Sequence, residues 1–174
     1  MSLNTALAIS LGVLGAVATW LFLGPLGGML AIWAAFIAWG CYYHCGGKET
    51  GLQSTILGTA AGAVIAGITL KVAAMGVGLP EVMWTAICVG LGVAAMVLLA
   101  NVPLFASIPA QVYGFASTVA YAMLKGGSVT AASMENPVAV IILSMIIGAV
   151  FGYVSEKVAG MLMGAGDHRA AAKV

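Results

Sequence analysis

Charged residues are scarce in this sequence. Only 6% of the 174 residues are Asp, Glu, Lys or Arg, whereas 63% are hydrophobic. A soluble domain averages about a quarter charged residues, so these side chains cannot cover a globular surface with hydrated groups, and we expect that surface to face lipid. The net charge is +1 and no basic stripe exists, which argues against a nucleic-acid partner because phosphate backbones are bound through clustered Lys and Arg.

Cysteine is also rare, with Cys41, Cys45 and Cys88 as the three examples. An odd number inside or beside apolar runs is not a disulfide framework, and such residues are typically small apolar fillers. The first twenty residues lack the Lys or Arg that opens a signal peptide. We therefore expect the first apolar run to be a retained membrane span.

Ionisable groups are missing from the centres of the apolar runs, since Glu81, Glu135 and Glu156 all stand at run ends. Ion-coupled transporters generally need a buried ionisable residue. The sequence also shows no nucleophile–base pair, phosphate-binding loop or complete metal motif. It therefore predicts neither an enzyme nor an ion pump, and no cofactor.

Long apolar runs dominate what is present. A hydrocarbon core of about 30 Å is crossed by roughly 20 apolar residues in a helix, and six such runs are separated by short Gly- and Pro-containing breaks. The runs are continuously apolar rather than alternating, which favours helices over a transmembrane β-barrel. We predict an all-α membrane protein with one transmembrane domain over residues 1–163 and a short cytoplasmic tail over 164–174. The six predicted spans are about Ala6–Leu23, Gly28–Tyr43, Leu52–Lys71, Val82–Ala100, Leu104–Leu124 and Pro137–Val154, the last extending as far as Met163 in the longer alternative.

Lys and Arg residues are unevenly divided between the two predicted faces of the membrane. Four of them would lie on the side of the N-terminus and two on the other side. Since cytoplasmic loops carry the excess of Lys and Arg, we expect a multi-pass membrane protein with both termini in the cytoplasm. The first group is Lys48, Lys157, Arg169 and Lys173, and the second is Lys71 and Lys125.

The two halves of the chain resemble each other. Pro25 and Pro103 end corresponding spans 78 residues apart, and the block Gly62–Val64 recurs 86 residues later as Gly148–Val150. Chance matching is the alternative, because chains rich in Ala, Gly, Val and Leu match themselves easily. Three spans in each half, about residues 5–72 and 82–160, would make the repeats inverted. Inverted repeats are common in channels and transporters.

Several short motifs resemble a known group of proteins. They are Gly40-Cys41 within an aromatic run, Ile108-Pro109-x-x-x-Tyr113-Gly114, and Ile147-Gly148-Ala149-Val150-Phe151-Gly152-Tyr153. On these residues the chain resembles the domain of unknown function 1097 family, small bacterial inner-membrane proteins, over nearly its whole length. The resemblance implies a multi-span membrane protein and carries no established activity. His44 and Cys45 before the Gly-rich turn depart from the family pattern.

Aromatic side chains gather in the second predicted span. Tyr42 and Tyr43 stand at its end, where Trp and Tyr form belts at the membrane–water interface, so we interpret both as interfacial. Phe36 and Trp39 lie deeper. They are candidates for a hydrophobic constriction, which gates a pore by excluding water.

Cys41, His44 and Cys45 share one face of a predicted helix because positions i, i+3 and i+4 are neighbours. Thiolate and imidazole groups bind zinc or copper. Only three ligands are present, and His168 in the tail could complete them only by coincidence. In the competing interpretation the cysteines fill space and His44 meets water. The sequence therefore predicts no resident metal and leaves these three residues as the alternative metal ligands.

The fifth span contains the polar residues Gln111, Tyr113, Ser117 and Thr118. An amide in lipid is costly unless it is hydrogen-bonded, so we expect Gln111 to face another helix or a wet cavity. These four residues are candidates for a pore lining, with an interhelical hydrogen bond as the alternative role of Gln111. Small residues four apart, as in Gly58–Gly62 and Gly148–Gly152, predict close helix packing.

The combination of apolar spans with a few uncharged polar residues favours a passive channel or facilitator for a small uncharged solute, acting as a homo-oligomer in the lipid bilayer. The alternative is a non-transporting membrane module that binds a partner or organises lipid. The alternative predicts a dry, fully packed interior, whereas a facilitator needs a polar path beside Gln111.

Overall fold

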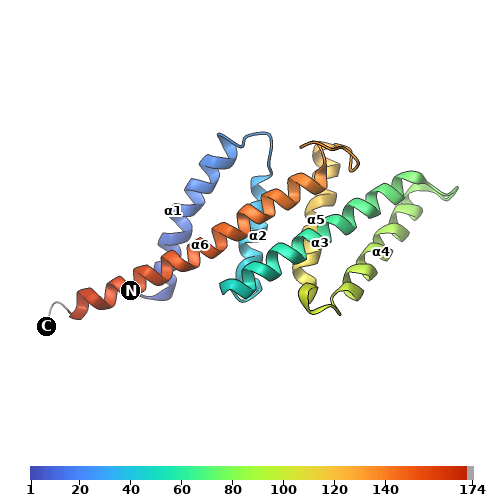
Figure 1. Cartoon of the computed structure of the whole chain (residues 1–174). Helices are drawn as coiled ribbons and strands as arrows, with labels where there is room; N and C mark the ends of the chain where they lie inside the picture. The colour runs from blue at the N-terminus through green and yellow to red at the C-terminus, as the bar shows by residue number, and fades with distance from the viewer. Residues whose placement is uncertain (172–174) are drawn as a thin grey trace.

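The computed structural model describes the backbone of residues 1–171 and the side chains of residues 1–164. Within the described backbone, regular structure consists of six α-helices and one short 3-10 helix (Figure 1). The predicted all-α class is thus confirmed. The side chains of His168, Arg169 and Lys173, which enter two of the sequence interpretations, lie outside the described residues. The helices are α1 (Leu3–Leu23), α2 (Ile32–His44), α3 (Lys48–Met75), α4 (Glu81–Leu99), α5 (Ile108–Lys125) and α6 (Pro137–Ala171), with η1 (Pro103–Phe105) ahead of α5.

Four helical segments are long and apolar enough to cross a membrane, namely α1, α3, α4 and the Pro137–Gly164 part of α6. The outer helices α1 and α4 bury few of their residues. Large apolar side chains such as Trp20, Val82 and Leu91 are more than half exposed. A surface of this kind is compatible with lipid contact and would be unusual in water.

The helix boundaries differ from the predicted ones where turn chemistry intervenes. α2 begins at Ile32 rather than Gly28 because residues 24–30 form turns and Gly28 has a φ of 78°, a conformation that favours glycine. α5 begins four residues later than predicted because η1 precedes it, and the Ser107 side chain then accepts a hydrogen bond from Ala110 N–H, which caps the helix. α6 continues to Ala171, so the predicted tail is helical over its first part.

The packing places the shorter helices at the centre. α5 packs mainly on α3, and α2 packs mainly on α6, while α3 and α6 also contact each other. The outer helices follow the same scheme, with α1 on α6 and α4 on α3. Figure 1 shows α1 and α4 at opposite ends of the molecule, with α3 and α6 side by side between them.

Glycine makes the closest helix contacts possible. A Cβ placed on Gly62 would overlap the backbone carbonyl oxygen of Gln111, and one placed on Gly148 would overlap that of Ala35. Gly114 is equally close to the Thr59 carbonyl. The predicted packing role of the small-residue stripes is confirmed at Gly62 and Gly148, since only a residue without Cβ permits this approach.

Candidate functional site

A buried polar group lies where α5 packs on α3, and we call it the α3–α5 polar seam (Thr55, Thr59, Gln111, Ser117, Thr118). All five residues are at least 97% buried. The Gln111 amide nitrogen donates to the Phe105 carbonyl oxygen at 2.8 Å. Among the described side chains, two buried polar atoms have no hydrogen-bond partner, the Gln111 carbonyl Oε1 and the Thr55 hydroxyl. Both belong to this seam.

Two other hydroxyls of the seam, those of Thr59 and Thr118, form hydrogen bonds within their own helices. Thr118 donates to the Gly114 carbonyl at 2.9 Å, and Thr59 donates to the Ile56 carbonyl at 3.4 Å. Thr hydroxyls commonly bond a preceding carbonyl of their own helix. An unpartnered buried polar atom costs about 1–3 kcal/mol, so the two open atoms at Gln111 and Thr55 are unusual and call for an explanation.

One stripe of α5 connects the seam to the opposite end of the molecule. Gln111, Gly114, Thr118, Tyr121 and Lys125 follow each other at spacings of three and four, and such residues share one helix face. Tyr121 and Lys125 line two adjoining pockets of about 320 and 390 Å³. The second of these pockets is mostly polar in its lining and also includes Glu135. The stripe therefore begins at an open pocket and ends at the buried amide.

The predicted constriction residues lie in another part of the fold. Trp39 is buried and donates its indole N–H to Ser155 Oγ at 3.0 Å. Phe36 stacks on Trp39 with ring centroids 5.7 Å apart and is 44% exposed. Both line a surface groove with Leu11 between α1 and α2. The structure thus separates Phe36 and Trp39 from Gln111, and their role in a constriction stays a prediction.

Tyr113 is half-buried, and its hydroxyl lies 3.1 Å from the Nδ1 atom of His44. This contact joins the His44 ring to α5. Cys41 and Cys45 themselves are close, with sulfur atoms 3.9 Å apart. Among the described residues, no group of three or more His, Cys, Asp or Glu side chains could hold a metal ion.

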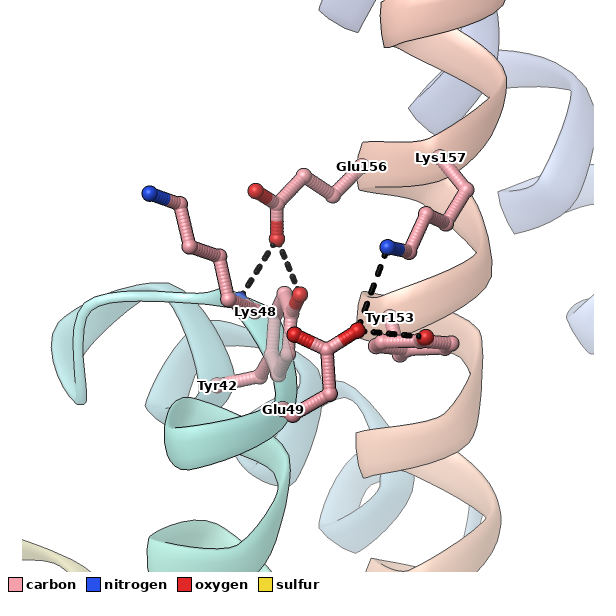
Figure 2. Close-up of polar contacts among 6 residues, drawn as sticks. All are labelled: Tyr42, Lys48, Glu49, Tyr153, Glu156 and Lys157. Atoms are coloured by element: carbon pink, nitrogen blue, oxygen red, sulfur yellow. Dashed lines mark hydrogen bonds and ion pairs between the residues drawn. The ribbon is translucent and has the colours of Figure 1, made fainter.

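The C-terminal end of α2 and the N-terminal end of α3 meet the middle of α6 in a charged cluster that sequence reasoning missed (Figure 2). The Glu156 carboxylate accepts hydrogen bonds from the Tyr42 hydroxyl and from the Lys48 backbone N–H, the latter at 2.8 Å. Glu49 accepts from the Tyr153 hydroxyl at 2.9 Å and from Lys157 Nζ at 3.2 Å. This charged cluster (Tyr42, Lys48, Glu49, Tyr153, Glu156, Lys157) ties the α2–α3 turn to α6.

The cluster explains the position of Tyr42. This side chain is fully buried, and its hydroxyl donates to Glu156, so it contacts the charged cluster rather than lipid or water, and its level in the membrane stays a prediction. The turn it supports is sharp, with positive φ at Gly46, Gly47 and Lys48. The adjacent acid–base pairs at the ends of two apolar runs, Lys48–Glu49 and Glu156–Lys157, were the sequence signal for this contact.

Comparison with known proteins supplies the family. The family model described as "Protein of unknown function (DUF1097)" matches residues 8–160. No curated protein and no solved structure shows a significant match to the chain. Because the family model covers most of the 174 residues, the chain belongs to the DUF1097 family of proteins of unknown function.

Proposed function

We propose that this protein is a six-span membrane facilitator, built from two inverted three-helix units, that passes a small uncharged solute along the α3–α5 polar seam. α1, α2 and α3 form one unit, and α4, α5 and α6 form the other. In this proposal α2 and α5 are the central spans, although the 13 residues of α2 rise only about 20 Å.

The helix contacts support the inverted arrangement. Each central helix packs on the long third helix of the other unit, α2 on α6 and α5 on α3. Each outer helix also packs on the long helix, α1 on α6 and α4 on α3. Exchanging the two units therefore reproduces the contacts. Figure 1 shows α1 and α4 running in opposite directions at the two ends of the molecule.

Individual contacts between residues also correspond when the two units are exchanged. Gly62 meets the carbonyl of Gln111, while Gly148 meets the carbonyl of Ala35. The two glycines are 86 residues apart, and their two partners are 76 residues apart. The α5–α6 connection (residues 126–136) is eight residues longer than the α2–α3 turn (residues 45–47), which accounts for most of this difference of ten. Corresponding positions in the two units thus make the same contact.

The observation that carries the functional proposal is the difference between the two equivalent seams. Gln111, Thr55 and Thr59 of the α3–α5 seam each have an equivalent residue in the α2–α6 seam when the two units are exchanged. These are Ala35, Ile141 and Met145, all buried. Since apolar residues are buried at the equivalent three positions of the other seam, the fold does not require polar residues at these three positions.

The chemistry of the polar seam suits a neutral solute that forms hydrogen bonds. The open Gln111 Oε1 accepts a hydrogen bond, and the Thr55 hydroxyl can donate or accept one. A passing solute or water molecule would satisfy both atoms and remove their desolvation cost. The seam residues carry no charge, so they give an ion no opposite charge to pair with. A Cβ on Gly62 or Gly114 would overlap the facing backbone carbonyl, so passage toward the pockets at Tyr121 and Lys125 requires α3 and α5 to separate at this seam.

The cellular setting belongs to the same proposal. We place the protein in the bacterial inner membrane with both termini in the cytoplasm, which puts the charged cluster on the cytoplasmic side. The exposed apolar faces of α1 and α4 would meet lipid or a second copy of the chain, and we propose a homo-oligomer on this ground.

Solute flux tests the proposal directly. Liposomes containing the protein should take up small amides or polyols faster than protein-free vesicles in a stopped-flow swelling assay. Gln111→Leu should lower the rate roughly tenfold, because one lost buried hydrogen bond is worth about 1–3 kcal/mol. Ser144→Ala is the matched control, since Ser144 is a buried hydroxyl on α6 that bonds Ala31 N–H outside this seam. No flux above protein-free vesicles for any solute tested would instead support the non-transporting module.

Loop accessibility tests the six spans. In a cysteine-free background, single cysteines at Asn101 and Ser128 should be labelled from opposite sides by a membrane-impermeant maleimide, because α5 would separate them. Gly46 should label from the side of Asn101. Labelling of Asn101 and Ser128 from the same side would contradict the assignment of α5 as a span.

A further inference from the structure

Two thiols face each other at the C-terminal end of α2. The Cys41 and Cys45 sulfur atoms lie 3.9 Å apart, and both cysteines are free. Cys41 is almost fully buried, while Cys45, the residue that ends α2, is partly exposed. The pair is therefore shielded on one side and reachable from the other. Cys88, the third cysteine, lies on α4.

The sulfur separation fits one bound metal ion. Thiolate–metal bonds are about 2.3 Å long, and two such bonds spanning 3.9 Å enclose an angle of roughly 115° at the metal. An ion held by two thiolates alone is close to linear, with its sulfurs about 4.6 Å apart, so the partly exposed Cys45 side chain would rotate outward slightly to hold it. Both thiols can therefore reach one ion with little movement of the backbone.

Polar groups surround the thiols from two further helices. Ser107 Oγ, at the start of α5, lies 3.4 Å from the Cys45 sulfur. The Thr55 hydroxyl of α3 is fully buried and lies near both sulfurs.

The ligand set selects the kind of ion. Among the described residues no third His, Cys, Asp or Glu joins the two thiols, and His44 is turned to Tyr113 instead. Structural zinc needs four such ligands. Soft thiolates select Cu(I), which is satisfied by fewer ligands. We propose that Cys41 and Cys45 bind one cuprous ion, releasing their two protons to water, with the hydroxyls of Ser107 and Thr55 beside it.

A competition titration tests this site. The full-length protein in detergent, held anaerobic and reduced, should withdraw about one equivalent of Cu(I) from the chromophoric chelator bicinchoninate. Cys41→Ser and Cys45→Ser should each lower the apparent affinity for Cu(I) at least roughly 100-fold, because one thiolate ligand is lost. Cys88→Ser is the matched control and should bind like the wild type. X-ray absorption on the loaded protein should show sulfur neighbours at about 2.2–2.3 Å.

Monodisperse gel filtration and unchanged far-UV circular dichroism would show that each variant is folded. Equal Cu(I) binding by wild type and the folded Cys41→Ser, Cys45→Ser double variant would overturn the proposal. A loss of binding in Cys88→Ser equal to that in Cys41→Ser would overturn it as well, because binding would then not be specific to this pair. Zn²⁺ retained as tightly as Cu(I) would contradict the choice of ion.

Discussion

Gly62→Ala and Gly148→Ala are each expected to destabilise the protein by about 2–4 kcal/mol, beyond the usual 1–3 kcal/mol of an overpacked core. A methyl group at either position would overlap a backbone carbonyl oxygen, of Gln111 or of Ala35. Backbone cannot rotate out of the way as a side chain can, so the two helices must separate and lose their contacts. Unfolding in mixed detergent and SDS micelles, followed by circular dichroism, measures the change in free energy.

Gly12→Ala and Gly90→Ala are the matched controls. Both glycines lie inside helices, and a Cβ at either would have no atom within 4 Å. Replacing an uncrowded helical glycine by alanine should stabilise the helix by up to about 1 kcal/mol. Comparable losses for Gly62→Ala and Gly148→Ala would support the inverted units. A loss at Gly62 no larger than at Gly12 would show that α3 and α5 are not this close.

Glu156→Ala is the second substitution with a large expected effect, a loss of about 2–4 kcal/mol. The change removes the acceptor for the Tyr42 hydroxyl and for the Lys48 N–H. Each buried donor left without a partner costs about 1–3 kcal/mol, and Tyr42 is fully buried. The positive φ of Lys48 would also lose its support, since the turn is held through that N–H. The same SDS unfolding measurement applies.

Two further variants separate hydrogen bonding from charge. Glu156→Gln keeps an acceptor oxygen and should retain more than half of the lost stability. Glu81→Ala removes an exposed glutamate at the start of α4 and should cost less than about 1 kcal/mol, the value of a helix-dipole interaction. If Glu156→Ala behaves like Glu81→Ala, the charged cluster of Figure 2 does not hold the α2–α3 turn to α6.

Local features of the fold could be predicted from the sequence because they depend on residues close together in the chain. Apolar runs and their Gly and Pro breaks predict the number of α-helices, and most boundaries fall within four residues of the observed ones. The close-packing role of Gly62 and Gly148 also followed from spacing alone. Gln111 was expected to avoid lipid because an amide is costly there, and it is fully buried.

Contacts between distant segments could not be predicted in the same way. Phe36 and Trp39 share the α2 helix with Cys41, yet they face the α1 side of the fold. His44 was grouped with the cysteines by helix spacing, but its ring bonds Tyr113, which is 69 residues away. Spacing shows which side chains share a face, whereas the partner of that face depends on which helices pack together.

The sequence alone determined two properties: six per cent charged residues cannot hydrate a globular exterior, so the surface suits lipid, and continuous apolar runs favour helices over alternating strands. The tertiary structure alone decided which polar groups meet, bringing Glu156 to Tyr42 across more than a hundred residues and leaving Gln111 Oε1 and Thr55 without partners beside α3 and α5. The physical reason is that hydrophobicity is a property of each residue. Hydrogen bonding requires two atoms within about 3 Å, and only the packing of the helices brings them together.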